Sequence, residues 1–277
     1  IWHLMTHTAG LTYGFMKDNA VDEMYRLAGS DFAQPPGLDL AGLCDLWAGM
    51  PLMFEPGTSS NYSVATDVLG RLIEVLTGKP LDVVFRERVL DPLGMDDTDW
   101  WAKDASRLAA LYAPMPGTGE AFRYDTIGKG ALHEPSWLGG GGGLVSTAYD
   151  YDRFTRMLLG RGELDGTRLL GSRTLDYMAR NHLPGGALLT ALARGQFAET
   201  AYDGMGFGLG FGVLMDPIAS KVPASAGEFT WGGAASTAFW VDPAEQITAA
   251  FFTQLLPSST YPIRTELRSL VYTALVD

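Results

Sequence analysis

The sequence predicts an α+β fold in which helices precede an antiparallel sheet. Apolar residues recur with helical spacing before residue 110, and runs rich in aromatic and β-branched residues, bounded by Gly, Pro and Asp, follow residue 200. Helices followed by consecutive strands are typical of the α+β class. A chain of 277 residues can bury a large core, and no internal repeat divides it. We therefore predict a single domain over 1–277, with a mainly helical lobe at 1–200 and strands with a final helix at 201–277.

The chain opens within a predicted helix. Ile1, Leu4 and Met5 have helical spacing, and Gly10 is expected to end the element. No initiator methionine, basic segment or signal peptide precedes them. We expect the sequence to be a fragment whose N-terminal part, with any localisation signal, is missing.

Three further helices are predicted before residue 110. Leucine and tryptophan recur on one face of segment 40–47, and segment 66–77 shows a similar face before a helix stop at Gly78. A third helix over 81–95 is expected to break near Pro92. The apolar face of the middle helix consists of Val68, Leu69, Leu72, Ile73 and Leu76.

Turn-forming residues fill the middle of the chain. Residues 111–136 predict a hairpin or a long loop. The glycine run 139–143 then precedes another helix, where Thr147 and Asp150 resemble a capping box. No Gly-Lys-Ser or Gly-Lys-Thr follows the glycines, so we interpret the run as backbone that passes close to other elements rather than as a phosphate loop.

Three strands are predicted beyond residue 200. They correspond to segments 204–216, 228–243 and 246–256, and a tight turn at 242–245 joins the last two. Segment 261–277 ends the chain as a helix, with Pro262 suited to its first turn.

The charge balance excludes one class of partner. The chain has 32 acidic and 20 basic side chains, a formal net charge of -12, which repels the phosphate backbone of a nucleic acid. No apolar run approaches the ~20 residues of a membrane span. Cys44 is the only cysteine, so the chain has no internal disulfide, and a reducing, cytoplasmic compartment is slightly favoured. The oligomeric state stays open.

The histidine spacing and the serine motifs of the chain bear on a metal site and on a nucleophile. His3 and His7 have the spacing of a zinc-binding helix, but Leu4 stands where the general-base Glu would follow the first His. We predict that both histidines pack or bind carbonyl groups, and that no metal is bound. Neither Gly-x-Ser-x-Gly nor Ser-x-x-Lys occurs in the chain, so no serine nucleophile motif is present.

Tyr62 allows two interpretations. It lies between a Pro-Gly turn and a predicted helix, a position where an aromatic residue usually packs as part of the core or of a hydrophobic staple. The positive end of the helix dipole also favours a phenolate, which would suit a general base with a cation nearby. Composition and spacing leave both interpretations open.

Several motifs in order resemble the penicillin-recognising, β-lactamase-like serine hydrolases, with most likeness to the class C branch that includes family VIII carboxylesterases. The segments that carry the resemblance are LMTHTAGLTYGF, FEPGTSSNYSVATDVLGRLIE, LDPLGMDDTDW, GGGGGLVSTAYDYDRF and FTWGGAASTAFWVDP. They span nearly the whole chain. The resemblance implies a β-lactamase/penicillin-binding-protein-like fold, a helical lobe plus an antiparallel sheet flanked by helices.

The resemblance also implies a mechanism without metal or cofactor. In this family a Ser-x-x-Lys motif precedes these segments, so the nucleophile would belong to the missing part. Tyr62, in the tyrosine box Tyr62-Ser63-Val64, would act as the general base. The N–H of Ala234 would form part of the oxyanion hole, just after the third box Trp231-Gly232-Gly233, which would contact the substrate. The fragment alone is expected to be inactive and poorly soluble.

The third box departs from the β-lactamase pattern and bears on the substrate. Trp231-Gly232-Gly233 replaces Lys-Thr-Gly, and Val64 replaces the Asn of class C β-lactamases. Without the lysine, a neutral ester is favoured over a penicillin-like anion. β-Lactam, peptide and linear amide substrates stay open as alternatives. A non-catalytic module of the same fold that holds a peptide or cell-wall fragment is the alternative outside the enzyme class.

Overall fold

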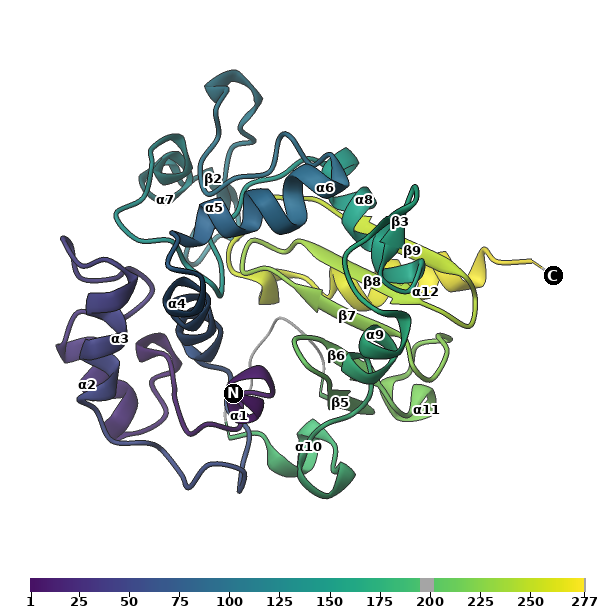
Figure 1. Cartoon of the computed structure of the whole chain (residues 1–277), viewed down its shortest axis with the longest axis horizontal. Helices are drawn as coiled ribbons and strands as arrows, with labels where there is room; N and C mark the ends of the chain where they lie inside the picture. The colour runs from purple at the N-terminus through teal and green to yellow at the C-terminus, as the bar shows by residue number, and fades with distance from the viewer. Residues whose placement is uncertain (195–201, 277) are drawn as a thin grey trace.

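The computed structural model describes residues 1–194 and 202–276. Helices form one side of the molecule, and a five-stranded antiparallel sheet with two packed helices forms the other (Figure 1). The predicted α+β class is confirmed. The predicted lobe boundary at residue 200 lies outside the described residues.

Short helices dominate the first hundred residues. They are α1 (Trp2–Met5), α2 (Ala20–Leu27), α3 (Leu40–Ala48), α4 (Ala65–Thr77), α5 (Leu81–Phe85) and α6 (Asp91–Leu93). The predictions for α3 and α4 are confirmed: the Asp39 carboxylate caps α3 by accepting the Gly42 N–H, and α4 ends at Gly78 in the left-handed region. Each boundary thus follows from a local capping residue.

Two details of these helices differ from the prediction. Helix α1 ends at Met5, and Gly10 lies in a later turn with φ +84, where a Cβ would meet the Phe54 carbonyl oxygen at 2.5 Å. The face predicted for α4 is only partly covered, because Leu76 is 74% exposed. The buried residues of α4 are Ala65, Asp67 and Gly70.

Pro92 does not break the third helix as predicted. The chain passes from α5 through a π-helical turn, η2 (Arg86–Leu90), directly into α6, which contains Pro92 in its first turn. In this wider turn the N–H of Asp91 donates to the carbonyl of Arg86, five residues earlier. Proline tolerates the first turn of the new segment because its missing N–H is not needed there. The helix ends instead at Gly94, with φ +63.

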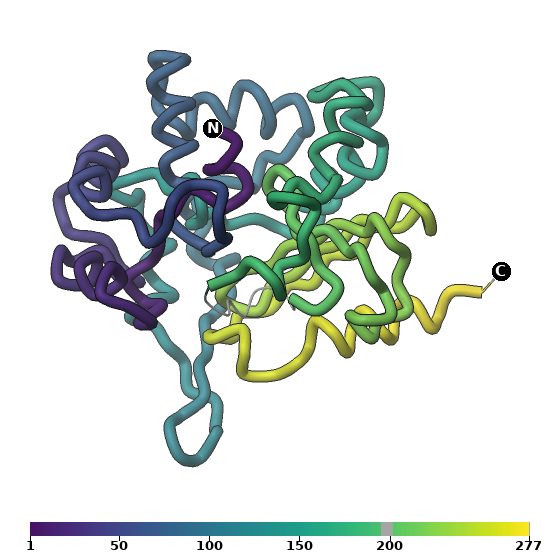
Figure 2. The backbone as a smooth tube through the Cα atoms, turned by 90° about the horizontal axis from the view of Figure 1, so that it is seen from below, coloured from purple at the N-terminus to yellow at the C-terminus, as the bar shows by residue number. Residues whose placement is uncertain are grey.

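A hairpin forms in the turn-rich middle, as one of the two predicted alternatives. Strands β1 (Tyr112–Pro114) and β2 (Ala121–Arg123) pair antiparallel. The hairpin projects from the body of the molecule in the view of Figure 2. After it come the short helix α7 (Asp125–Gly128) and α8 (Ala148–Leu159), whose first turn is capped by the Thr147 side chain accepting the Asp150 N–H.

Several short elements after α8 were not predicted. They are β3 (Glu163–Leu164), β4 (Thr167–Arg168), α9 (Ser172–Met178), α10 (Leu189–Leu192) and α11 (Pro217–Ser220). Each is too short to show a clear apolar period in the sequence.

The sheet has five strands in sequence order where three were predicted. They are β5 (Met205–Phe207), β6 (Gly212–Leu214), β7 (Phe229–Gly232), β8 (Ala238–Asp242) and β9 (Ile247–Phe251). The segments 204–216 and 228–243 were each predicted as one strand, but each folds into two. The first reversal uses Gly210 at φ +99, and the β7–β8 turn has Ser236 at φ +71. The predicted turn at 242–245 is confirmed, since the Asp242 carboxylate accepts the N–H groups of Ala244 and Glu245.

The sheet is covered on both faces. Phe239 and Val241 of β8 join a core with Met157 and Leu158 of α8. Trp240, between them on the strand, points to the opposite face, where α12 (Ile263–Thr273) packs. The final helix was predicted. Within the described parts of the chain, no helix has both the length and the apolar character that crossing a bilayer requires.

Candidate active site

Tyr62 lies in an extended segment immediately before α4. Its chain neighbour Asn61 is tied to the segment that follows α1 by two bonds: the Asn61 N–H donates to the His7 carbonyl at 2.9 Å, and the Asn61 side-chain amide donates to the Leu11 carbonyl at 3.1 Å. Two residues after Tyr62, the Val64 N–H donates to the Thr12 carbonyl. Contacts between segments some fifty residues apart in sequence therefore hold the half-buried Tyr62 in place.

His7 holds both sides of Tyr62. Besides the backbone bond to Asn61, its Nδ1 lies 3.3 Å from the Ser63 hydroxyl oxygen, and its ring centroid lies 4.8 Å from that of Tyr62. His7 adopts φ +53, a conformation that only a few per cent of non-glycine residues adopt. Its side chain is only 7% exposed, and burial lowers the pKa of His7 to about 4, so the imidazole is neutral at pH 7. His7 is thus a neutral support for the tyrosine.

The stability of the chain is expected to fall in acid because of His7. Since its folded-state pKa of about 4 lies below the ordinary value of 6.5, its contribution is present above pH 6.5 and is lost as the pH falls towards 4. Between pH 7.5 and 4.5, wild type should lose about 2–3 kcal/mol of unfolding free energy more than His7→Asn, which does not titrate and tolerates positive φ. Urea unfolding at both pH values measures this. The exposed His133→Asn serves as the control and should behave as wild type; equal losses in all three proteins would contradict the assignment.

Tyr13 is a second aromatic neighbour of Tyr62, and Asp67 lies near Tyr13. The ring centroids of Tyr13 and Tyr62 are 5.3 Å apart. Burial raises the pKa of Tyr13 well above its usual value, and the nearby acidic groups of Tyr62 and Asp67 raise it further. Burial also raises the pKa of Asp67 to about 6, against the opposing effect of the N–H groups of Gly141 and Gly140. This pair therefore presents a neutral phenol and a carboxyl group that titrates near neutral pH.

The glycine run passes along α4, and the predicted close backbone passage is confirmed. The Gly141 N–H donates to the Asp67 carboxylate at 2.9 Å. A Cβ at Gly140 would lie 2.3 Å from the Thr66 carbonyl oxygen, and one at Gly141 would lie 3.2 Å from the Tyr13 hydroxyl oxygen. Any side chain at Gly140 would push the run away from the first turn of α4.

The third box reaches Tyr62 from the sheet. Trp231 is near the end of β7, and its ring centroid lies 5.5 Å from that of Tyr62 and 5.3 Å from that of Phe207. The two following glycines leave room for protein atoms: a Cβ at Gly232 would lie 2.7 Å from the Arg264 guanidinium carbon, and one at Gly233 would lie 2.4 Å from the Thr237 hydroxyl oxygen. The packing of the chain itself therefore explains both glycines.

Ala234 lies in the turn between β7 and β8. The turn is held by bonds from the Ser236 N–H to the Gly233 carbonyl at 2.9 Å and from the Arg264 guanidinium to the same carbonyl at 2.6 Å. Ala234 is exposed, and within 1–194 and 202–276 its N–H donates to no protein acceptor. A backbone N–H without a protein acceptor can donate to an oxyanion.

The two histidines do not converge. His3 lies 2.8 Å from the Thr8 hydroxyl oxygen and His7 lies 3.3 Å from that of Ser63, so each binds a hydroxyl rather than a carbonyl. The alternative that they pack is confirmed for His7, whose ring contacts Tyr62 and Phe207. Among the residues that the structure describes, no group of three His, Cys, Asp or Glu side chains is placed to hold a metal.

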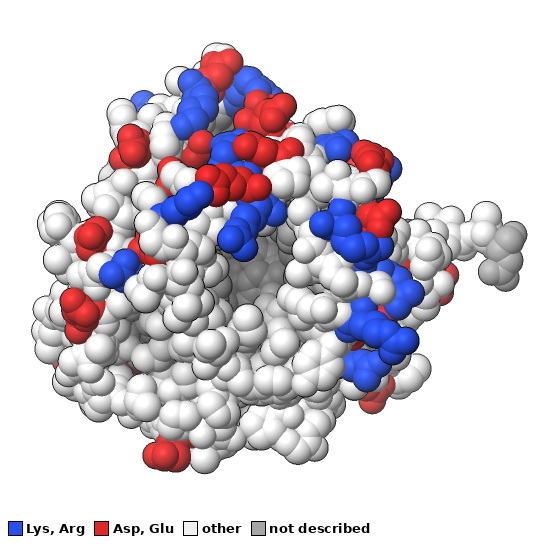
Figure 3. All heavy atoms as spheres, in the orientation of Figure 1, with Lys and Arg blue, Asp and Glu red and all other residues white. Residues whose placement is uncertain are grey.

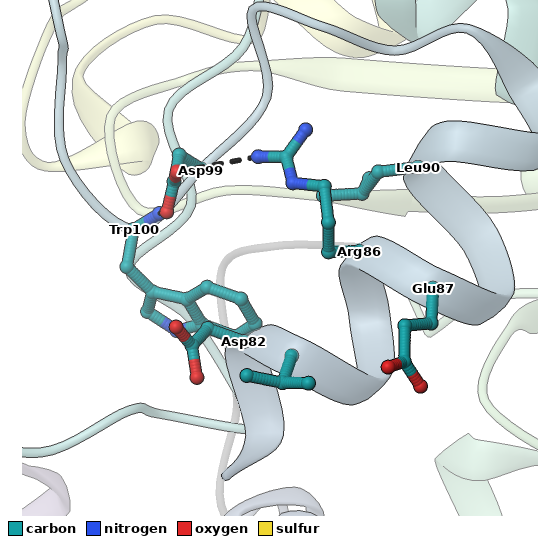
Figure 4. A pocket seen from close by; sticks show the side chains of 7 residues that line it. Asp82, Arg86, Glu87, Leu90, Asp99 and Trp100 are labelled. Atoms are coloured by element: carbon teal, nitrogen blue, oxygen red, sulfur yellow. Dashed lines mark hydrogen bonds and ion pairs between the residues drawn. The ribbon is translucent and has the colours of Figure 1, made fainter.

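A separate pocket of about 300 Å³ lies between α5, η2 and residues 99–100 (Figure 4). Arg86 points across it to Asp99, with 3.2 Å between nitrogen and oxygen, and also donates to the Thr98 carbonyl. Its charge is therefore already paired, and none of the predicted site residues lines this pocket. The face drawn in Figure 3 is hollowed near its centre, and charged side chains gather above the hollow and along its right edge.

The structure adds residues that the sequence did not single out. His7 was predicted to pack or to bind a carbonyl group but was not linked to Tyr62, and Tyr13, Asp67 and Arg264 were not considered. His7 and Tyr13 lie in the LMTHTAGLTYGF segment. The resemblance therefore marked this segment but not the roles of these two side chains.

Comparison with known proteins agrees with this arrangement. The family model Beta-lactamase matches residues 1–273. The chain belongs to the β-lactamase family. The predicted family resemblance and fold are confirmed, and this β-lactamase family chain places its tyrosine box beside its third box across the junction of helices and sheet.

Relatives of this β-lactamase family chain include esterases. Protein Rv1367c of Mycobacterium tuberculosis is 36% identical over 92% of the chain and 62% of its own length, and Esterase EstB of Burkholderia gladioli is 30% identical over 98% and 69%. The solved structure of "EstCE1, a hydrolase with promiscuous acyltransferase activity" has a TM-score of 0.78 at 29% identity, over 98% of this chain and 71% of that one. The chain thus spans 62% of the length of the Mycobacterium relative.

Proposed function

We propose that the full-length protein is a serine hydrolase that cleaves carboxylic esters through an acyl-enzyme. The observation that carries this proposal is the contact between Tyr62 and Trp231, whose ring centroids are 5.5 Å apart although 169 positions separate them in sequence. It joins a phenol at the entrance of α4 to the strand that leads to the exposed Ala234. The similarity to Esterase EstB supports an ester substrate.

The nucleophile in this proposal is a serine of a Ser-x-x-Lys segment that precedes Ile1 in the full-length protein, because residues 1–277 contain no such motif. The phenolate of Tyr62 takes the serine proton as Oγ forms a bond to the ester carbonyl carbon. The carbonyl oxygen becomes an oxyanion that accepts the Ala234 N–H. The C–O bond to the alcohol then breaks, and the alkoxide leaves with the proton held by Tyr62. Water, deprotonated by Tyr62, hydrolyses the acyl-enzyme by the same steps.

The third box supports a neutral substrate. Trp231 presents an apolar ring where the β-lactamase pattern has lysine, and the nearby Arg264 guanidinium already donates to the carbonyls of Gly233 and Thr237 at 2.6 and 2.8 Å. A substrate carboxylate would have to compete with these bonds.

Labelling with a fluorophosphonate tests the proposal. The full-length protein should gain the mass of one adduct, mapped to a serine that is followed three residues later by lysine, while residues 1–277 alone should gain none. A folded full-length protein without an adduct would contradict the hydrolase. That result would favour a non-catalytic module that binds a peptide or cell-wall fragment.

A further inference from the structure

Five aromatic side chains form a continuous row that starts at the third box and passes through Tyr62. Successive ring centroids are 5.5 Å apart between Trp231 and Tyr62, 5.3 Å between Tyr62 and Tyr13, 4.7 Å between Tyr13 and Phe15, and 6.1 Å between Phe15 and Phe32. We call this row the aromatic strip. Tyr13 and Phe15 are stacked nearly parallel, with 17° between their ring planes.

The aromatic strip is assembled from distant parts of the chain. Trp231 comes from β7, Tyr62 from the segment before α4, and Phe15 from the single turn η1 (Gly14–Met16). Tyr13 immediately precedes that turn, and Phe32 lies in the loop after α2. Local sequence therefore could not reveal the row.

Exposure separates the aromatic strip from the aromatic core. Phe32 is 52% exposed and the other four members are partly exposed, whereas Trp47, Phe229 and Trp240 in the core are at most 2% exposed. Leaving this much aromatic area in water forfeits apolar burial, which a flat apolar ligand would recover. The strip therefore has the properties of a binding surface that starts at the proposed base.

The chemistry of the aromatic strip favours an uncharged ring system. Apart from the proposed base Tyr62, its members are uncharged at pH 7: Trp231, Phe15 and Phe32 have no ionisable group, and the raised pKa of Tyr13 keeps that phenol neutral. Ring faces and edges attract other rings by offset stacking and edge-to-face contact, beyond the gain from buried area. An alkyl chain of equal area would gain only the free energy of burying apolar surface.

We propose that one half of the ester substrate is an extended, uncharged aromatic or fused-ring group that lies along the aromatic strip while the ester bond lies at Tyr62. This inference rests on the proposed ester hydrolysis and specifies its substrate class. The acid half and the alcohol half of an ester could each supply such a group, so the test treats them separately.

The test compares matched esters on the full-length protein. For the acid half, p-nitrophenyl naphthylpropanoate is compared with p-nitrophenyl octanoate, which has the same leaving group. For the alcohol half, naphthylpropyl acetate is compared with octyl acetate, whose alcohols are of similar acidity. In one of the two halves, the naphthyl ester should exceed its octyl partner in kcat/KM by about tenfold.

Variants tie this preference to the aromatic strip. Phe32→Ala and Phe15→Leu should each lower the naphthyl-to-octyl ratio by about three- to tenfold in the half that shows the preference. The ratio is taken within one variant, so the amount of active protein cancels. Tyr149→Ala, which removes a 69% exposed ring outside the strip, should leave the ratio unchanged.

The outcomes distinguish the inference from the proposed function. Hydrolysis of p-nitrophenyl acetate without a naphthyl preference in either half would overturn the aromatic strip as a substrate site and leave the esterase standing. A preference that neither Phe32→Ala nor Phe15→Leu reduces would also overturn it. Failure to hydrolyse any ester, together with no fluorophosphonate adduct, would overturn both.

Discussion

Replacing Tyr62 by phenylalanine in the full-length protein is expected to lower kcat/KM for p-nitrophenyl acetate by about 100- to 10,000-fold. The substitution removes the oxygen that would carry the serine proton and keeps the ring that packs on His7, Tyr13 and Trp231. The fold should therefore be retained. Steady-state kinetics measure the loss, and urea unfolding verifies that the variant is folded.

Tyr13→Phe is the matched control for that substitution. It removes a hydroxyl from the adjacent ring, 5.3 Å away between centroids, whose raised pKa makes it a poor base at neutral pH. Its effect on kcat/KM should be smaller than that of Tyr62→Phe, because it removes a hydrogen bond to the Tyr62 oxygen but keeps that oxygen. Near-normal turnover by a folded Tyr62→Phe protein would return Tyr62 to the role of a packed aromatic.

Replacing Arg268 by methionine is expected to lower the free energy of unfolding by about 3–5 kcal/mol. The Arg268 guanidinium in α12 pairs with Glu228, which is fully buried beneath this helix. The Tyr272 hydroxyl lies 2.7 Å from Glu228 and 2.8 Å from Asp242, which is also fully buried. Without the guanidinium, a carboxylate would be left unpaired in a site that already contains a second one. Urea unfolding at pH 7 measures the loss.

Two further variants separate the loss of the charge pair from other effects. Glu228→Gln combined with Arg268→Met should recover part of the lost stability, because no charge then stays unpaired at position 228. Lys79→Met breaks an exposed pair with Glu87 and should cost less than about 1 kcal/mol. A cost for Arg268→Met as small as that of Lys79→Met would show that the buried pair contributes little.

The sequence predicted best those elements whose boundaries are local. Helix α4 ends at Gly78, α3 begins after Asp39, and α8 begins after Thr147, because each terminus depends on residues within one turn. The prediction failed where the same residues can form either one continuous strand or two strands joined by a turn. Segment 204–216 reads as one strand, yet Gly210 adopts positive φ and the chain reverses there.

The sequence by itself determined the α+β class, the acidic charge and, through ordered motifs, the family, because these depend on composition and local order. It also marked Tyr62 and Trp231 as candidates. Only the tertiary structure decided that their rings are neighbours, that His7 supports Tyr62 as a neutral side chain, and that Phe15 and Phe32 extend the row to the surface. The physical reason is that contact and burial depend on distance in space, which the packing of helices against the sheet sets and which spacing along the chain does not record.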